Sequence, residues 1–389
     1  MVGCVAPSAA DVGGPVRVLE LLVSTELGGG PAHVRDLIAG LAGPEFRFTV
    51  GGPAGGALLP ALTAAGADFE PVAADRLSPG ALRDTIRLAR ARRIQVIHSH
   101  GKGAGLYGRI AARLTGAASV HTLHGIHPSG YGGLYLPLER ALSRRTFAVV
   151  HVSESQATLA RALGLAPAGR TRVIVNGIDA ASVRAAATRA PISRAMLGLR
   201  PDALVLATVA RFDPVKRLEV LLRALPLVVA RVPEAQLLVV GDGPERDALH
   251  ALARTLALGD RVVFAGAIPD AARVLPLVDL YLTASRREGL PTALLEAMAC
   301  GVPVLATEVP GHVDAVEPEI TGRLVPPDDA PGLAAAAALL LRDPALRARM
   351  GRAGRERVER HFTRARMLAE IAVLYREAAG FPAGSARSV

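Results

Sequence analysis

The sequence predicts an α/β protein built from two doubly wound parallel-sheet domains that face a central cleft. Short β-branched runs alternate with amphipathic stretches along almost the whole 389-residue chain. Strands that are apolar throughout, each followed by a helix, indicate parallel sheets covered on both faces. One sheet of about twelve strands would be unusually large. The chain length also fits more than one domain at roughly 150 residues per domain, so we expect two sheets.

Each predicted strand is a short run rich in Val, Ile, Leu, Phe or Ala. The predicted strands are Val16–Ser24, Phe46–Gly51, Phe69–Val72, Val96–Ser99, Ala118–Thr122, Ala148–Val152, Val173–Val175, Leu204–Ala210, Gln236–Val240, Val262–Ala265, Leu280–Thr283 and Val302–Ala306. Helices predicted between them include Ala32–Leu41, Pro79–Ala91 and Gly105–Thr115. Because such sheets bind ligands beyond the carboxyl ends of their strands, two facing sheets are expected to share one cleft.

The strand–helix alternation is lost around Asn176–Arg200, and we place the domain boundary there. Asn176-Gly177 is a turn signal, and an alanine- and arginine-rich connector follows it. We therefore assign residues 1–180 to the first domain and 181–363 to the second. Pro331–Phe362 is expected to be helical, and a helix at about Arg364–Ala379, within residues 364–389, is long enough to cross back onto the first domain.

Composition excludes several classes of protein. Hydrophobic residues make up 50% of the chain, which excludes a disordered protein. Two cysteines, Cys4 and Cys300, cannot form a disulfide framework, which fits a reducing compartment. The sequence contains neither an apolar run as long as a membrane span nor a basic n-region typical of a secretory signal. We therefore expect a cytoplasmic protein, with peripheral attachment to the inner face of the membrane as an open alternative.

The strongest chemical signal lies between Ser285 and Pro303. A predicted strand ends in a loop that contains Glu288, and the helix expected to begin near Leu290 carries Glu296 in its second turn. The free N–H groups and positive end of a helix suit a phosphate. Carboxylates beside an anion site are favourable where they bind the hydroxyls of a sugar or ribose. Taken singly, either glutamate could equally be a solvated surface residue.

A second signal follows the strand Leu204–Ala210. Arg211 offers a bidentate fork to phosphate oxygens, and Lys216 offers a mobile point charge five residues later. Only Lys102 and Lys216 are lysines among the 45 basic residues, so Lys216 stands out in a chain whose default cation is arginine. In Gly241-Asp242-Gly243-Pro244, the glycines permit close backbone approach to a ligand, although a plain turn explains them as well.

These segments, together with Asn176-Gly-Ile-Asp179, resemble the retaining glycosyltransferases of family 4, which have the GT-B fold of two Rossmann-like domains. The resemblance covers nearly the whole chain and is most specific in the second half. It implies that the first domain binds the acceptor and the second the nucleotide-sugar donor. It further implies that Arg211 and Lys216 hold the donor diphosphate beside the Gly289 and Leu290 N–H groups. Glu288 would then reach the donor sugar hydroxyls and Glu296 the ribose.

The first half matches the family less tightly. Gly29 and Gly30, in Leu27-Gly-Gly-Gly30, are similar to the family's glycine loop near the donor phosphates, although Pro31-Ala32 departs from the usual continuation. By the same resemblance, His124 is the histidine expected near the reacting sugar, with Gly125 beside it. His98, His100 and His121 compete for that role, and a histidine at a strand end is often purely structural. We assign His100, Lys102, His124 and Gly125 to acceptor binding.

The predicted mechanism needs neither a metal nor a cofactor. Arg211, Lys216 and the helix N-terminus would stabilise the charge that grows on the diphosphate, and no Asp-x-Asp pair is present. Because no nucleophilic carboxylate is evident, we expect front-face displacement, in which the leaving phosphate takes the acceptor proton. Gly103-Ala-Gly105-Leu-Tyr-Gly108 matches a dinucleotide-binding pattern, but the ribose-binding acid expected about 20 residues later is missing.

The net charge of +10 leaves the acceptor open. Two predicted helices carry arginines that could attract an anionic membrane, which fits a lipid-linked sugar acceptor in envelope or exopolysaccharide synthesis. They are Arg83, Arg87, Arg90, Arg92, Arg93, Arg140, Arg144 and Arg145. Ordinary solvated helix faces are the alternative. Few aromatics and no nucleic-acid-binding module argue against nucleic acid. Two rival functions remain, a non-hydrolysing nucleotide-sugar epimerase and a non-catalytic sugar-nucleotide-binding protein.

Overall fold

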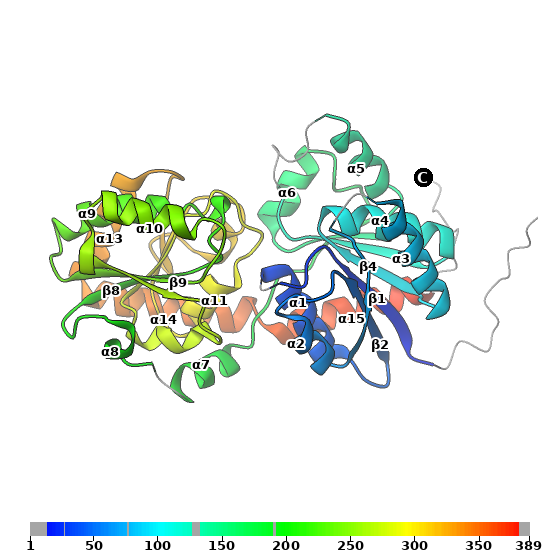
Figure 1. Ribbon diagram of the computed structural model, residues 1–389, viewed down its shortest axis with the longest axis horizontal. Helices are drawn as coiled ribbons and strands as arrows, with labels where there is room; N and C mark the ends of the chain where they lie inside the picture. Colours follow the sequence, from blue (N-terminus) through cyan, green and yellow to red (C-terminus); the bar gives the residue numbers. More distant parts are fainter. Residues whose placement is uncertain (1–13, 27, 76–77, 127–132, 190–191, 381–389) are drawn as a thin grey trace, which may run out of the picture.

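Two parallel sheets, each with helices packed on both faces, form the protein (Figure 1). The computed structural model describes residues 14–26, 28–75, 78–126, 133–189 and 192–380. The first sheet has seven strands in the order β3-β2-β1-β4-β5-β6-β7, and the second has six in the order β10-β9-β8-β11-β12-β13. The predicted α/β fold with two doubly wound sheets is confirmed. Cys4, Leu27 and the tail after residue 380 lie outside the described residues.

The first sheet is built from residues 16–173, and six helices from the described part of the same stretch surround it. Its strands are β1 Val16–Leu22, β2 Phe46–Gly52, β3 Ala67–Pro71, β4 Val96–His100, β5 Ala118–Leu123, β6 Ala148–His151 and β7 Thr171–Val173. The helices are α1 Gly29–Leu41, α2 Leu59–Ala64, α3 Pro79–Ala91, α4 Lys102–Thr115, α5 Tyr135–Ser143 and α6 Glu154–Ala162. Aliphatic residues of α1 pack on one face and those of α3 and α4 on the other.

The second sheet uses residues 204–325. Its strands are β8 Leu204–Val209, β9 Ala235–Val240, β10 Val262–Gly266, β11 Leu280–Thr283, β12 Val304–Thr307 and β13 Gly322–Val325. The helices after the first sheet are α7 Ala180–Arg189, α8 Arg194–Leu197, α9 Leu218–Val229, α10 Arg246–Thr255, α11 Thr292–Ala299, α12 His312–Ala315, α13 Ala330–Arg342, α14 Pro344–His361 and α15 Arg364–Gly380. α9 and α13 pack on one face of the sheet, and α11 packs on the other.

The structure differs from the predicted elements most clearly at one edge strand, in the helical stretch near the end of the second domain and at the starts of two helices. A further edge strand, β13, pairs with β12 although its sequence Gly-Arg-Leu-Val is short and only partly apolar. The expected helix over Pro331–Phe362 is divided into α13 and α14, because Asp343 caps α14 by accepting a hydrogen bond from the Leu346 N–H (2.8 Å). Helices α1 and α4 begin three residues earlier than predicted, at Gly29 and Lys102.

Helix α15 returns from the second sheet to the first. Figure 1 shows α14 beside the second sheet and α15 beside β1 and β2 of the first. Met367, Ile371, Leu374 and Tyr375 of α15 are buried in the same apolar cluster as the core of the first sheet. The chain switches sheets between Val173 and Leu204, a stretch that contains α7 and α8 and the predicted boundary at residue 180.

Candidate active site

Loops at the carboxyl ends of the two sheets touch each other. Gly289, in the loop after β11, packs so closely on the loop after β5 that a Cβ atom there would lie 1.8 Å from the His124 carbonyl oxygen. Gln156 of α6 accepts a hydrogen bond from the Ile126 N–H (2.7 Å) and donates one to the Glu288 carbonyl (2.5 Å). The loops that the sequence assigned to donor and acceptor binding therefore lie side by side.

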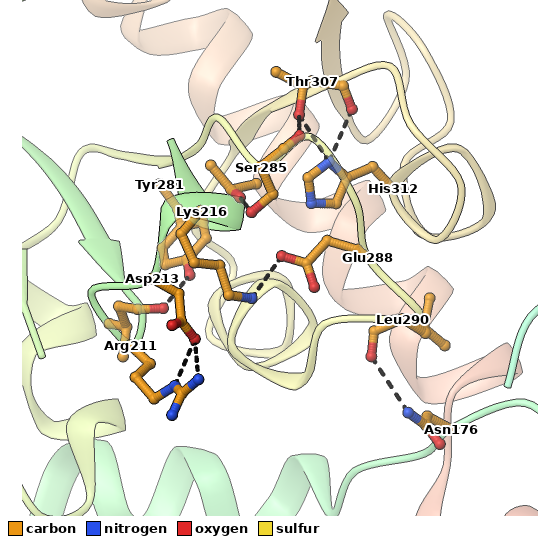
Figure 2. A network of polar contacts seen from close by, with 12 residues as sticks. Asn176, Arg211, Asp213, Lys216, Tyr281, Ser285, Glu288, Leu290, Thr307 and His312 are labelled. Atoms are coloured by element: carbon orange, nitrogen blue, oxygen red, sulfur yellow. Dashed lines mark hydrogen bonds and ion pairs between the residues drawn. The ribbon is translucent and has the colours of Figure 1, made fainter. Parts of the chain in front are cut away.

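An ion pair between Lys216 and Glu288 lies within this site (Figure 2). The Lys216 Nζ is 2.7 Å from the Glu288 Oε1, and the two side chains are 25% and 10% exposed. Lys216 ends the short 3₁₀ turn that follows β8, and β8 and β11 are neighbours in the sheet. Burial raises the pKa of Glu288, but the Lys216 charge, the nearby His312 and the hydrogen bonds from Lys216 and Ser285 together outweigh burial and hold that pKa below its usual value. The glutamate is therefore ionised at neutral pH.

Arg211 lies on the same loop as Lys216 but contacts a different acid. Its Nε donates to the Asp213 Oδ2 at 2.6 Å, and its side chain is 56% exposed. In Figure 2, Arg211 points to Asp213, whereas Lys216 points to Glu288. The structure thus places the two predicted phosphate-binding cations at one end of the sheet, each held by a carboxylate.

A buried histidine that the sequence reasoning missed stands behind Glu288. The His312 Nδ1 is 2.8 Å from the Thr307 carbonyl, and the Thr307 hydroxyl donates to the Ser285 carbonyl at 2.5 Å. The His312 Nε2 is buried without a hydrogen-bond partner among the described residues. Burial lowers the pKa of His312, while the Glu288 charge opposes that shift. The one feature of the sequence that could have marked His312 as a site residue is its position soon after the predicted strand Val302–Ala306.

Two further residues assigned to the nucleotide lie at α11: Leu290 precedes the helix, and Glu296 is within it. The Leu290 carbonyl accepts a hydrogen bond from the Asn176 Nδ2 at 3.3 Å. Burial raises the pKa of Glu296, nearby Asp270 and Asp36 raise it further, and Arg35 opposes them. Asp36 and Arg35 belong to α1, so Glu296 is close enough to the first domain to sense its charges.

The glycines of Gly241-Asp242-Gly243 serve the packing of two loops. A Cβ atom at Gly241 would lie 1.8 Å from the Ala210 carbonyl oxygen, and one at Gly243 would lie 2.7 Å from the Phe212 backbone nitrogen. Phe212 also donates its N–H to the Asp242 carbonyl at 2.8 Å. Gly243 is therefore explained by contact with the Arg211 loop, and its role in donor binding stays a prediction.

On the first domain, the structure brings the glycine loop and His124 together. Gly29 and Gly30 begin α1, and a Cβ atom at Gly30 would lie 3.7 Å from the His124 ring. The ring of His33, also on α1, packs edge-on against His124 with 5.0 Å between centroids. Burial lowers the pKa of His124, and the nearby histidines lower it further. His124 is therefore a neutral imidazole at physiological pH.

The competing histidines are more deeply buried. The His100 Nδ1 lies 2.9 Å from the His124 Nε2, so His100 stands directly behind His124. The His98 ring nitrogens contact the Tyr375 hydroxyl (2.6 Å) and the Thr122 hydroxyl (2.7 Å). His121 is buried too, and its Nδ1 contacts the Ser99 carbonyl at 3.0 Å. His98 and His121 therefore hold the sheet together, and His100 supports His124.

Gly125 and Lys102 lie at the rim of the first domain. Gly125 is half-buried beside His124. Lys102 is the exposed first residue of α4, with its Nζ 5.1 Å from the centre of the Tyr135 ring. Partial burial lowers the pKa of Lys102, Glu139 opposes that shift, and Arg287 of the Glu288 loop adds to it. Lys102 thus lies against Tyr135 of the first domain and is close enough to the Glu288 loop to sense the charge of Arg287.

Glu20, His98 and His100 are the described residues whose side chains could surround a metal ion. Their potential ligand atoms lie within 4.8 Å of one another. Both His98 ring nitrogens already have hydroxyl partners, and the Glu20 Oε2 and His100 Nε2 contact each other at 2.7 Å. These contacts fit a satisfied hydrogen-bond network better than a metal centre.

Two known families match the chain. "Glycosyl transferases group 1" matches residues 190–357, and "Glycosyltransferase Family 4" matches residues 27–182. D-inositol 3-phosphate glycosyltransferase from Saccharomonospora viridis is 32% identical over 320 residues, covering 76% of this chain and 72% of the relative. UDP-Gal:α-D-GlcNAc-diphosphoundecaprenol α-1,3-galactosyltransferase from Escherichia coli is 27% identical, covering 62% of this chain and 65% of the relative.

The fold also resembles that of a solved structure. The crystal structure of Anabaena HepE in complex with UDP and glucose superposes with a TM-score of 0.83 at 22% identity, covering 93% of this chain and all of that one. Together with the matching families and the two facing sheets, this likeness settles the assignment that the Glu288 and Arg211 segments predicted. The chain is a glycosyltransferase of family 4 with the GT-B fold.

Proposed function

We propose that this enzyme moves a sugar from a nucleotide-diphosphate donor to a hydroxyl acceptor with retention of anomeric configuration and without a metal. The observation that carries the proposal is the Lys216–Glu288 ion pair, which lies beside the Arg211 loop and before the start of α11. The pair places a mobile cation next to an ionised carboxylate, the two groups that a charged diphosphate and a polyhydroxylated sugar require.

Charge neutralisation drives the proposed reaction. As the bond between the sugar and the phosphate breaks, negative charge grows on the diphosphate, and Arg211, Lys216 and the N–H groups at Gly289 and Leu290 stabilise it. Preorganised donors of this kind need no reorganisation during the reaction. Asp213 and Glu288 hold the two cations until the donor arrives. Glu288 then binds the sugar hydroxyls, and Glu296 binds the ribose.

We expect displacement on one face of the sugar, because no nucleophilic carboxylate is evident in the sequence. The acceptor hydroxyl attacks the anomeric carbon from the side of the leaving diphosphate, which takes the hydroxyl proton as the glycosidic bond forms. His124 lies opposite Gly289 and lines the position expected for the donor sugar. Contact between the two domains excludes water, which would otherwise hydrolyse the donor.

A donor panel tests the proposal. We would incubate the enzyme with UDP-, GDP-, ADP- and dTDP-sugars and a panel of acceptors, with and without EDTA, and determine the anomeric configuration of the product by NMR. The expected result is a product with the configuration of the donor sugar, formed equally in EDTA. An inverted product or a loss of activity in EDTA would contradict the mechanism. An epimerised donor without acceptor would identify an epimerase, and donor binding without turnover would identify a binding protein.

For the acceptor, we propose a lipid-linked sugar used in envelope or exopolysaccharide synthesis, reached from the cytoplasmic face of an anionic membrane. The name of the Escherichia coli relative, a diphosphoundecaprenol-linked galactosyltransferase, supports this class of acceptor. Leu134 and Leu138 are 89% and 42% exposed at α5, close in sequence to Arg144 and Arg145. Among the described residues, no helix combines the length and the apolarity needed to span a bilayer.

Several of the arginines that suggested a membrane surface have partners within the protein, including Arg83 and Arg87, which lie near Asp84. Arg92 pairs with Asp68 (3.1 Å) and Glu70 (2.7 Å), and the Arg140 Nε donates to the Leu163 carbonyl at 2.8 Å. The membrane proposal therefore depends on α5 and its exposed leucines. Co-sedimentation with anionic and neutral liposomes tests it. We expect binding to anionic vesicles that Leu134→Ser weakens, and equal, negligible binding to both would contradict it.

A further inference from the structure

A line of buried hydrogen bonds connects the C-terminal helix to the active-site histidine. The Tyr375 hydroxyl of α15 donates to the Glu20 Oε1 (2.6 Å), the Glu20 Oε2 lies 2.7 Å from the His100 Nε2, and the His100 Nδ1 lies 2.9 Å from the His124 Nε2. Tyr375, Glu20 and His100 are at most 2% exposed. We call these four residues the histidine network.

The chemistry of the carboxylate fixes the direction of every bond in the histidine network. Burial raises the pKa of Glu20, but His98 and His100 outweigh burial and lower it, so the carboxylate is ionised and can only accept hydrogen bonds. Burial lowers the pKa of His100 to about 4, so its ring is neutral at pH 7. A neutral ring that donates from Nε2 to Glu20 has a bare lone pair on Nδ1.

The same reasoning then applies to His124. The His100 Nδ1 can only accept, so the His124 Nε2 must carry the proton and donate it across the 2.9 Å contact. The His124 ring is neutral as well, which leaves its Nδ1 as a lone pair. Among the described residues, His100 is the hydrogen-bond partner of the His124 ring, and no other contacts the Nδ1.

We infer that Glu20 and His100 are positioning residues that hold His124 in the Nε2–H tautomer, so that its Nδ1 accepts a hydrogen bond from a hydroxyl of the bound sugar. Tyr375 completes the arrangement by fixing the second carboxylate oxygen. A carboxylate that orients an imidazole through one ring nitrogen so that the other can act is a known device in enzymes. This inference rests on the proposed transfer reaction and extends it to residues that lie outside the cleft.

Nitrogen NMR on the full-length enzyme tests the tautomer directly. In protein labelled with ¹⁵N-histidine, the ring nitrogens of His124 are identified as the signals lost in His124→Asn. We expect a protonated Nε2, an unprotonated Nδ1 at pH 7.5, and a shift of the Nδ1 signal when nucleotide sugar is added. A protonated Nδ1, or an Nδ1 signal that saturating donor leaves unchanged, would overturn the inference.

Kinetics of matched variants test whether the tautomer matters. Glu20→Leu and His100→Leu break the histidine network, whereas His100→Gln keeps an amide donor toward Glu20 and a carbonyl acceptor toward His124. We expect each leucine variant to lose kcat by about 10- to 100-fold, the usual effect of removing a residue that orients an active group, with little change in donor KM. The kcat of the double variant should be no lower than that of either single variant, because both residues act through the same chain of hydrogen bonds to His124. His100→Gln should recover most of the activity.

A control separates positioning from simple loss of a buried histidine. His151 is fully buried on β6 of the same sheet, and neither ring nitrogen has a hydrogen-bond partner among the described residues. His151→Leu should leave kcat and the His124 spectrum unchanged. Folded leucine variants of Glu20 and His100 with full kcat would overturn the inference, as would a His100→Gln variant as impaired as His100→Leu.

The outcomes stay separable from those of the proposed function. If neither leucine variant folds, as judged by circular dichroism, the wild-type spectrum and His100→Gln decide between support and rejection by the criteria above. If the wild-type enzyme transfers no sugar from any donor, the proposed function fails. In that case the Nδ1 signal and its response to nucleotide sugar still decide the tautomer and its contact with ligand.

Discussion

At the scale of single residues, the two cations of the active site are each held in an ion pair with a carboxylate. Lys216 is held by Glu288 and Arg211 by Asp213, so neither cation faces the cleft without a counter-ion. An incoming diphosphate offers each cation a stronger partner, since phosphate oxygens carry more charge and accept several hydrogen bonds. The exchange would free the Glu288 carboxylate to bind sugar hydroxyls at the moment the phosphates arrive.

Replacing Lys216 by Ala removes one of these preorganised charges. We expect kcat/KM to fall by about 10²-fold or more, the scale of losing one contact that stabilises developing charge. Steady-state kinetics with the preferred donor would measure it. Arg360→Ala is the matched control, because Arg360 is 67% exposed in a surface pair with Glu356 and should leave activity unchanged. Full activity in Lys216→Ala would refute the assignment.

The buried histidines should make the free energy of unfolding depend on pH. Burial lowers the pKa of His33 to about 3 and that of His151 to about 4. Below about pH 6.5 the unfolded chain protonates these histidines, whereas the folded chain does not. The free energy of unfolding is therefore highest above that pH and falls as the pH drops toward 4. Each histidine contributes about 1.4 kcal/mol per pH unit in that window.

Urea unfolding between pH 7.5 and 5 measures this effect. His151→Leu should reduce the slope of the free energy of unfolding against pH by the contribution of one histidine. Equal free energies of unfolding at pH 7.5 and pH 5 in the wild-type protein would contradict the prediction.

The sequence could point to Lys216 and Glu288 because each follows a strand that it could identify, and parallel strands end at one edge of a sheet. It could not point to Glu20, which looked like a single acid inside an apolar strand. Its partner Tyr375 lies 355 residues away. Hydrogen-bond partners brought together by helix packing leave no local pattern in the chain.

At the scale of elements, the loop between β11 and α11 is the most tightly constrained part of the site. Gly289 lies against the His124 carbonyl and is also approached by Gly311, at which a Cβ atom would lie 2.4 Å from the Gly289 carbonyl oxygen. The loop therefore contacts the first domain on one side and its own domain on the other. The phosphate binding that we propose for its backbone would depend on both contacts.

Gly289→Ala should displace this loop, because the new Cβ would overlap the His124 backbone. We expect a fall in kcat/KM of about 10²-fold, the effect of moving reacting groups by about 1 Å. Gly43→Ala provides the comparison, since a Cβ at residue 43 has no atom within 4 Å and should change neither activity nor melting temperature. A Gly289→Ala enzyme with normal kcat/KM would show that the loop is adaptable.

Among the elements, the apolar strands were predictable and the edge strand was not. Strands such as β9 are buried on both faces and are therefore apolar, apart from Gln236 in β9. β13 begins with Gly322 and Arg323, and it is a strand because it pairs with β12 rather than because of its composition. Edge pairing is a tertiary effect that a short polar sequence does not reveal.

At the scale of the whole molecule, one buried glutamine bridges the two halves of the site. Gln156 joins the Ile126 N–H of the first domain to the Glu288 carbonyl of the second. Ser155, its neighbour, donates its N–H to the Asp314 Oδ1 at 3.0 Å. The start of α6 thus holds the domains together next to the expected position of the sugar.

Replacing Gln156 by Leu should loosen this closure. We expect more hydrolysis of the donor relative to transfer, because water enters a site that no longer closes tightly. Gln236→Leu is a matched control, since Gln236 is also buried and joins the Arg200 N–H (2.9 Å) to the Asp260 carbonyl (2.6 Å) within one domain. Both variants should lose about 1–3 kcal/mol of stability. An unchanged ratio of hydrolysis to transfer in Gln156→Leu would contradict the role in closure.

The meeting of the strand-end loops followed from the sequence, because two sheets with ligand loops at their strand ends can share a site only by facing each other. The individual contacts between the domains did not follow. Gln156 itself looked like an ordinary helix residue, and its side chain was not predicted to join the domains. Side chains that join two domains satisfy backbone groups far away in the sequence, and these become visible only when the domains are in place.

The position of Tyr375 has a consequence for how the enzyme is made. The first domain packs α15 into its core and pairs the Tyr375 hydroxyl with Glu20, 355 residues earlier. At ribosomal speeds of about 5–20 residues per second, roughly 20–70 s separate the synthesis of the two residues. During that time the nascent first domain exposes an apolar face and an acid that lacks its hydroxyl partner. It reaches its final form only after helix α15 has left the ribosome.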